Sequence, residues 1–96
     1  MTAIMEHLSI KEIHDRLEEL AGWELIGQEI TKEFLFKDFN EAKEFVHKVG
    51  EEAEREPHFP DINIRYNKVE IRLTTHDANG LTYKDFKLAR IIEQLV

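Results

Sequence analysis

Two alternating runs of apolar and polar residues constrain the fold of this chain more than any other feature. Residues 62–66 place Ile, Ile and Tyr at every second position, and residues 69–73 do the same with Val, Ile and Leu. Alternation with a period of two is the pattern of a strand that buries one face. Only Asn67 and Lys68 separate the runs, and asparagine tolerates the positive φ of a tight turn. The pattern therefore predicts an antiparallel hairpin.

A second pair of strands is predicted earlier in the chain. Residues 23–28 form a short apolar-rich stretch, and residues 29–37 alternate between apolar and polar side chains. We interpret the two stretches as paired strands that are joined at residues 27–29.

The first of three predicted helices precedes these strands. Ser9 and Glu12 have the spacing of a capping box, which predicts a helix over about residues 10–20 that Gly22 closes. Its apolar positions recur at helical spacing and are Ile10, Ile13, Leu17 and Leu20.

The second predicted helix lies between the two strand pairs. Either Asp38 or Asn40 caps it, and Pro57 disfavours helical geometry at Glu56, so we expect the helix to end there. Its apolar stripe comprises Phe39, Ala42, Phe45, Val46, Val49 and Ala53.

The third predicted helix ends the chain. Asn79 and Gly80 form a turn, and Thr82 with Asp85 form another capping box. The apolar positions of this helix are Phe86, Leu88, Ala89, Ile92 and Leu95.

The predicted fold class is α+β, with one domain over residues 1–96. The element order is helix, two strands, helix, two strands, helix, and the packing expected is a four-stranded antiparallel sheet with three helices on one face. One sheet face stays uncovered in this arrangement. We therefore expect a homodimer or homotetramer that associates through sheet edges or the open face.

Composition excludes several functional classes. The net charge is −7 and the basic residues are scattered, so direct nucleic-acid binding is not expected. The chain has no cysteine, which excludes disulfides, thiolate nucleophiles and cysteine-based zinc sites. No apolar run is long enough to span a membrane, and residues 1–9 lack the apolar core of a signal peptide. A cytoplasmic location is the expectation.

Two histidines stand out because they fall on irregular backbone at the two ends of the predicted hairpin. His58 lies at the corner between the second helix and the hairpin, and His76 follows its second strand on the side opposite the core face. Histidines on loops that the core does not need are common in proton transfer near neutral pH. The alternative is that both are ordinary surface histidines, as we expect for the remaining ones, which are His7, His14 and His47.

A metal site is the other possibility for this region. His58 and His76 could combine with Glu54, Asp77 or Asp85 as nitrogen and oxygen ligands. No compact ligand motif such as His-Glu-x-x-His is present, so no metal is expected.

Read together, these residues resemble the pterin-4a-carbinolamine dehydratase family, which in animals also includes the dimerisation cofactor of a homeodomain transcription factor. The family motif is Glu-x-x-x-His-His-Pro, then Tyr-Asn-x-Val-x-Ile-x-Leu-x-Thr-His-x-x-x-Gly-Leu, then an aspartate. The chain matches it without a gap at Glu54, His58, Pro60, Tyr66, Asn67, Val69, Ile71, Leu73, Thr75, His76, Gly80, Leu81 and Asp85. It departs at Phe59, where the family has its second histidine, and at Asn79, where glycine is common.

The resemblance implies a cofactor-independent hydro-lyase that dehydrates 4a-hydroxytetrahydropterin to quinonoid dihydropterin in tetrahydrobiopterin recycling. His58 and His76 match the acid–base histidines. The histidine that Phe59 replaces helps to hold the pterin in the family. Phe59 either stacks on the flat pterin instead or leaves the chain with weaker or different activity.

The same resemblance implies the residues around the substrate. Glu54 and Asp85 would orient the histidines, and Thr75 to Asp77 would bind the polar edge of the pterin. The substrate-binding set expected is Glu54, Phe59, Pro60, Thr75, Asp77 and Asp85.

Two alternatives remain open at this point. The chain could be a non-catalytic dimerising protein on the same fold, which the Phe59 departure favours. It could also act on another pterin-like substrate, such as a molybdopterin precursor.

Overall fold

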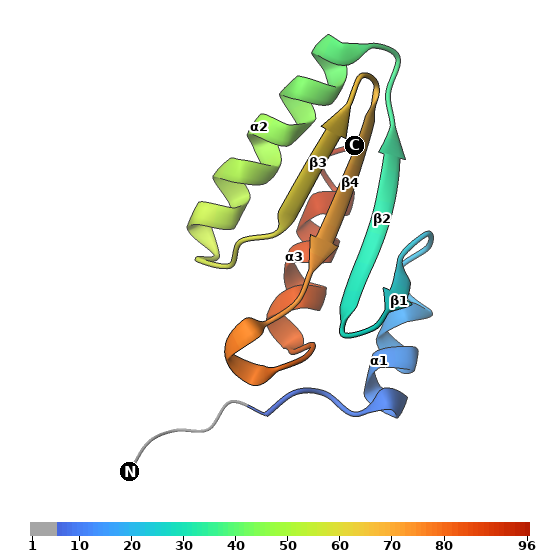
Figure 1. Cartoon of the computed structure of the whole chain (residues 1–96), viewed down its shortest axis with the longest axis vertical. Helices are drawn as coiled ribbons and strands as arrows, with labels where there is room; N and C mark the ends of the chain where they lie inside the picture. Colours follow the sequence, from blue (N-terminus) through green and yellow to red (C-terminus); the bar gives the residue numbers. More distant parts are fainter. Residues whose placement is uncertain (1–5) are drawn as a thin grey trace.

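A computed structural model describes residues 6–96 and shows the predicted order of elements (Figure 1). The elements are α1 (Ile10–Leu17), β1 (Glu24–Ile26), β2 (Glu29–Leu35), α2 (Phe39–Arg55), β3 (Asp61–Arg65), β4 (Lys68–Leu73), a single 3₁₀ turn (His76–Ala78) and α3 (Tyr83–Glu93). No helix in this part of the chain is long and apolar enough to cross a membrane. The expectation about a signal peptide concerns residues 1–9, of which residues 1–5 lie outside the described part.

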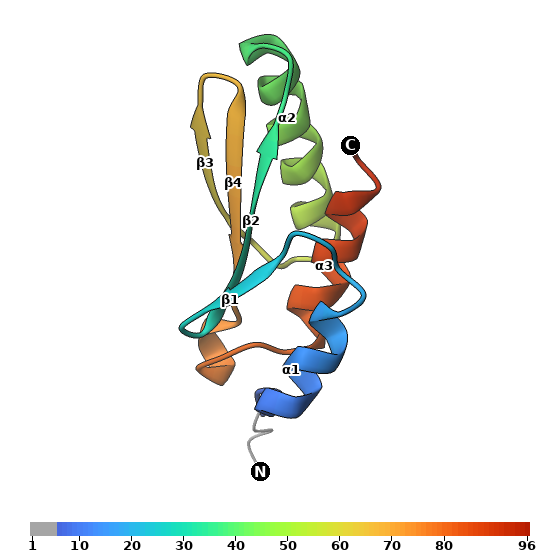
Figure 2. The same cartoon turned by 90° about the vertical axis from the view of Figure 1, so that its right-hand side faces the viewer.

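The strands form one antiparallel sheet in the order β1-β2-β4-β3. All three helices lie against the same face of that sheet, and no helix or strand among residues 6–96 covers its other face (Figure 2). The α+β prediction is therefore confirmed. β3 and β4 run antiparallel, and Asp61 at the start of β3 pairs with Arg72 near the end of β4. The segment that enters β3 and the segment that leaves β4 thus meet at one end of the sheet.

The turn between β3 and β4 differs from the prediction by one residue. Arg65 pairs with Lys68, so the loop consists of Tyr66 and Asn67, and Lys68 belongs to the strand. Tyr66, at φ 52°, adopts the left-handed conformation that we expected of asparagine. Asn67 instead donates its side-chain amide to the carbonyl oxygen of Phe36 over 3.0 Å, and this bond anchors the turn to the end of β2.

Apolar side chains from the inner face of the sheet and from the three helices form one core. Its fully buried members include Ile30, Val69, Ile71, Leu73, Phe86, Leu88 and Ile92. The predicted stripe of α2 is confirmed at Ala42, Phe45, Val49 and Ala53. Phe39 was wrongly placed in that stripe, because it occupies the first position of the helix beyond the end of β2, where 46% of its surface stays exposed.

The helix ends follow their capping residues. Ser9 and Glu12 form the predicted capping box of α1, Asp38 accepts the Glu41 N–H at the start of α2, and α2 ends at Arg55 as Pro57 predicted. α1 ends at Leu17, three residues earlier than expected. Residues 18–22 form turns in which Gly22 has φ 88° and Leu20 still reaches the core.

Candidate active site

The fold brings His58 and His76 to one pocket at the end of the sheet where β3 begins and β4 ends. His58 lies in the connection between α2 and β3, and His76 begins the 3₁₀ turn after β4. Both side chains line a pocket of about 250 Å³. Its complete lining is Pro57, His58, Phe59, Thr74, Thr75, His76, Asp77 and Lys84.

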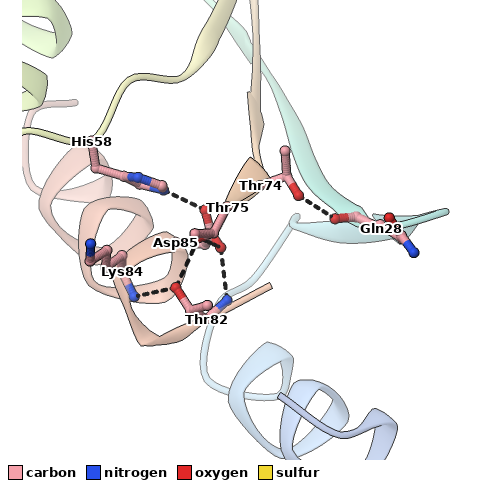
Figure 3. A network of polar contacts seen from close by, with 7 residues as sticks. All are labelled: Gln28, His58, Thr74, Thr75, Thr82, Lys84 and Asp85. Atoms are coloured by element: carbon pink, nitrogen blue, oxygen red, sulfur yellow. Dashed lines mark hydrogen bonds and ion pairs between the residues drawn. The ribbon is translucent and has the colours of Figure 1, made fainter. Parts of the chain in front are cut away.

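A buried carboxylate lies behind this pocket. Asp85, in the first turn of α3, is 0% exposed and accepts three hydrogen bonds (Figure 3). Its Oδ2 accepts from the Thr82 N–H over 2.9 Å and from the Thr75 hydroxyl over 2.8 Å. Its Oδ1 contacts Nε2 of His58 over 2.6 Å. A buried carboxylate needs such donors to offset its desolvation, and Asp85 has them on both oxygens.

The direction of each hydrogen bond follows from the number of protons available. The Thr75 hydroxyl gives its only proton to Asp85, so in the 2.8 Å contact between the two hydroxyls Thr82 must donate to Thr75. The Thr82 oxygen then accepts the N–H of Lys84 over 3.3 Å. Each polar group in this series of hydrogen bonds therefore has a partner. Within residues 6–96 no buried side-chain nitrogen or oxygen lacks one.

The same reasoning sets the tautomer of His58. A carboxylate accepts hydrogen bonds, so Nε2 carries the hydrogen that lies between His58 and Asp85. Nδ1 is then the ring nitrogen that can exchange a proton with a ligand. The His58 side chain is only 11% exposed, and its backbone N–H donates to the Ala53 carbonyl at the end of α2 over 3.1 Å. Backbone and ring are thus both fixed.

His76 has a different environment from His58. His76 is exposed, and its ring forms no hydrogen bond with any of the described residues. The backbone around it is well defined, because its carbonyl accepts the N–H of Asn79 over 3.0 Å and Thr75 pairs with Gly80. The pocket therefore combines one histidine held by a carboxylate and one that is free to contact a ligand.

The remaining predicted site residues divide into three groups. Phe59, Thr75 and Asp77 line the pocket, and 67% of the Phe59 surface is exposed there. Asp85 lies behind the pocket and reaches it through His58 and Thr75. Glu54 is exposed on the last turn of α2, and neither Glu54 nor Pro60 is among the lining residues.

Several pocket residues were missed by the sequence reasoning, namely Lys84, Thr74 and Pro57. Lys84 is the only cation of the lining. The sequence places Lys84 between Thr82 and Asp85, at the start of the helix that follows the His76 loop. That position could have indicated that Lys84 lies near the pocket. Thr82 was expected only as a helix cap, but its hydroxyl also supports Thr75.

The residues of this pocket can hold a flat polar ring and move protons. The two imidazoles are groups that can donate and accept protons, Phe59 has an aromatic face, and Asp77 and Lys84 are polar groups of opposite charge. No group of three or more potential metal ligands comes together among residues 6–96.

Comparisons with known proteins agree with this picture. The model of the family described as pterin 4 alpha carbinolamine dehydratase matches residues 6–95. A protein of Cyanothece sp. that carries the name of this family is 54% identical over 88 residues, covering 92% of this chain and 91% of its own. One of Sulfurisphaera tokodaii with the same name is 48% identical over 92 residues, covering 96% and 99%.

A solved structure is also similar. The transcriptional coactivator/pterin dehydratase of Brucella melitensis superimposes with a TM-score of 0.91 at 35% identity, over 94% of this chain and 98% of its own.

Proposed function

The chain belongs to the pterin 4 alpha carbinolamine dehydratase family, and on that premise we propose that it removes water from a 4a-hydroxytetrahydropterin. The product is the quinonoid dihydropterin, and the reaction serves to recycle a tetrahydropterin cofactor. One observation carries the proposal, namely that His58 and His76 line the same pocket.

The reaction requires two proton transfers. The lone pair of the nitrogen beside carbon 4a expels the hydroxyl group, which leaves as water once a proton donor has protonated it. A base then removes a proton from the cationic ring, which gives the neutral quinonoid product. An unperturbed histidine has a pKa of about 6.5 and can therefore serve either as donor or as acceptor near neutral pH. Positioned acid–base groups typically accelerate such steps by roughly 10²–10⁴-fold.

His58 and His76 take these two roles. Asp85 acts as a positioning residue, because its carboxylate holds His58 in the Nε2–H tautomer without touching the pocket itself. Thr75 and Thr82 hold Asp85 in turn. Such supporting hydrogen bonds keep a reacting group within the narrow geometry that catalysis needs.

The substrate is held by the rest of the lining. Phe59 offers an exposed ring for offset stacking on the pterin, in place of the second histidine of the family motif. Asp77 and Lys84 lie within the same lining and suit the amino and carbonyl groups on the edge of the pterin.

We also propose that the protein is a homo-oligomer. β3 is an edge strand whose unpaired backbone groups are available to a second copy. A two-fold axis at Asn63 would place Asp61 opposite Arg65 of the second copy, which gives two ion pairs across the joined sheets. Light scattering measures the mass of the purified protein in solution, and this mass tests whether the protein is a homo-oligomer.

The decisive experiment on the enzyme follows the ultraviolet absorbance of a freshly generated 4a-hydroxytetrahydropterin. The wild-type protein should accelerate its dehydration, and His76→Ala should lower kcat by roughly 10²–10⁴-fold. His76 is exposed, so this variant should fold normally. His47→Ala is the matched control, because His47 is an exposed histidine on α2 that pairs with Glu51 away from the pocket.

An absence of acceleration by the wild-type protein would refute the proposal. In that case Phe59→His separates the alternatives. A gain of activity in this variant would identify the natural chain as a non-catalytic member of the family that uses the fold for assembly or binding.

A further inference from the structure

A second contact joins the segment that carries His58 to the helix that carries Asp85. The segment comprises residues 56–60 and is called the α2–β3 corner below. The carboxylate of Glu56, two residues before His58, contacts the ammonium group of Lys87 over 2.8 Å. Lys87 lies two residues after Asp85 on α3. Among the ion pairs of residues 6–96, only this one and the pair of His58 with Asp85 join the corner to α3.

The two contacts lie on opposite sides of α3. Residues that are two positions apart on a helix point about 200° apart around its axis. Asp85 is 0% exposed and faces the interior, whereas 55% of the Lys87 side chain is exposed. His58 therefore holds the corner to α3 from the interior, and Glu56 holds it from the solvent side.

The backbone between Glu56 and His58 has little freedom. Glu56 ends α2, and its N–H donates to the carbonyl oxygen of Glu52 over 3.0 Å. The next residue is Pro57, whose ring fixes φ at about −65°. The N–H of His58 then donates to the carbonyl oxygen of Ala53 over 3.1 Å. A shift of Glu56 relative to α3 is therefore passed on to the ring of His58.

The helix α2 itself gives no reason for a carboxylate at residue 56. Glu56 is the C-terminal cap of α2, and the helix dipole disfavours a negative charge at that end. Its partner accounts for it, because the hydrogen bond to Glu56 and the charge of its carboxylate raise the pKa of Lys87 above its ordinary value. By contrast, Glu54 of the family motif forms no ion pair among residues 6–96.

We propose that Glu56 and Lys87 are positioning residues, whose ion pair holds the α2–β3 corner against α3. The ring of His58 then stays within 2.6 Å of the Asp85 carboxylate. Neither Glu56 nor Lys87 lines the pocket of the two histidines, so both act through His58. The inference rests on the proposed function, because it takes His58 to transfer a proton.

The substitution Lys87→Met tests the pair, since it removes the ammonium group and keeps an unbranched apolar side chain. It should lower kcat for dehydration by roughly 2- to 5-fold, as expected for the loss of one partly exposed ion pair. KM for the pterin should change less, because Lys87 is outside the pocket lining.

Nuclear magnetic resonance gives a readout that needs no turnover. The hydrogen on Nε2 of His58 lies in the contact with Asp85, and the His58 side chain is only 11% exposed. This hydrogen should exchange with water roughly 2- to 5-fold faster in Lys87→Met, because the corner opens away from α3 more often. The measurement separates the two proposals. If the wild-type protein does not accelerate dehydration, the enzyme is refuted and the exchange rate still decides whether the pair positions His58.

The matched control is Lys11→Met. Lys11 forms an exposed ion pair with Asp15 over 3.1 Å on α1, and neither residue lines the pocket. This variant also loses one surface ion pair, so a general effect of such a loss would appear in both variants. It should keep the wild-type kcat and the wild-type exchange rate of the His58 hydrogen.

Reversal of the charges provides the rescue. The double variant Glu56→Lys, Lys87→Glu restores an ion pair at the same place, and a lysine suits the C-terminal end of α2. It should return kcat and the exchange rate to within about twofold of the wild type, a residual smaller than the loss of the whole pair. Glu56→Lys alone, which sets two cations against each other, should be at least as impaired as Lys87→Met.

Three results would overturn the positioning role. The first is an unchanged exchange rate in Lys87→Met, which, even with a lower kcat, would show that the ammonium group acts through its charge alone. The second is an equal effect of Lys11→Met on kcat and exchange. The third is a failure of the charge-reversed double variant to recover.

Discussion

The imidazole of His58 donates its Nε2 hydrogen to Oδ1 of Asp85 over 2.6 Å, across 27 residues of sequence. The carboxylate is fully buried, and the ring lies at the wall of the pocket. The first turn of α3 therefore determines which nitrogen of His58 carries the hydrogen. This relationship links the stability of the fold to the proposed chemistry, because one carboxylate caps the helix and fixes the histidine.

Replacing Asp85 by asparagine should impair both the cap of α3 and the positioning of His58. The amide oxygen can still accept from Thr75 and Thr82, but the NH2 group then faces His58. His58 either leaves its Nε2 hydrogen without an acceptor, at a cost of roughly 1–3 kcal/mol in the free energy of unfolding, or changes to the tautomer that carries the hydrogen on Nδ1. We expect kcat for dehydration to fall by roughly 10²-fold, which is the cost of a displaced reacting group.

A loss of stability alone would not change the tautomer of His58. The ¹⁵N chemical shifts of the His58 ring measure the tautomer directly. Ile92→Val is the matched control, because it removes a core methylene from the same helix, at roughly 0.5–1.5 kcal/mol, without touching the network. Equal kcat values for the two variants would show that Asp85 has no positioning role.

Most of the fold could be predicted from local patterns in the sequence. Ser9 with Glu12, Asp38, and Thr82 with Asp85 each begin a helix as predicted, because capping depends on residues three positions apart. The strands could also be predicted locally, because a strand that buries one face alternates apolar and polar residues. Tyr66 is the exception, because the register of β4 with β2 and β3 determines the turn, whatever the preference of the side chain.

The site was only partly predictable. His58 and His76 were identified because they fall on loops at the two ends of one hairpin. The contact between the pocket residue Thr74 and the carbonyl oxygen of Gln28 could not be predicted, because it depends on how β2 pairs with β4. This contact spans 46 residues of sequence. Contacts of that kind arise from the packing of the sheet and have no local signature.

Phe59 should contribute to substrate binding rather than to stability. Because 67% of its surface is exposed, Phe59→Ala should change the free energy of unfolding by less than about 0.5 kcal/mol. Loss of a stacked ring, which is typically worth about 0.5–1.5 kcal/mol, should raise KM by roughly 2- to 12-fold with a smaller change in kcat. Phe59→Leu keeps the apolar surface without the aromatic face. If Leu restores the wild-type KM, Phe59 acts by size and not by stacking.

A polar cluster near the other end of α3 should matter for stability alone. Glu93 accepts from the indole N–H of Trp23 over 2.7 Å and from the ammonium of Lys32 over 2.5 Å. Lys32 also donates to the carbonyl of Ala21 over 3.0 Å, so the cluster joins α3 to β2 and to the turn before β1. Glu93→Ala should lower the free energy of unfolding by roughly 1–3 kcal/mol, as measured by urea denaturation.

The control for this cluster is Glu33→Ala, since Glu33 is an exposed carboxylate of β2 for which we expect a change within about 0.5 kcal/mol. Neither variant should change KM for the pterin. A loss of activity in Glu93→Ala at a temperature where it is fully folded would contradict a purely structural role.

The capping box of α1 should make stability depend on pH. The carboxylate of Glu12 accepts the backbone N–H of Ser9 over 3.0 Å, and this hydrogen bond lowers the pKa of Glu12 below its ordinary value. A carboxylate whose pKa is lowered by folding stabilises the native state above its unfolded pKa, which is about 4.3 for glutamate. That contribution is lost as the pH falls through the lower folded pKa.

Glu12→Gln tests this directly, because glutamine can still form a capping box but does not titrate. The free energy of unfolding of the wild type, measured in urea from about pH 7 to about pH 3, should fall more steeply on acidification than that of the variant. Glu18→Gln is the comparison, since Glu18 is an exposed glutamate at the other end of the same helix. If Glu12→Gln and the wild type follow parallel curves, the hydrogen bond to Ser9 does not persist in solution.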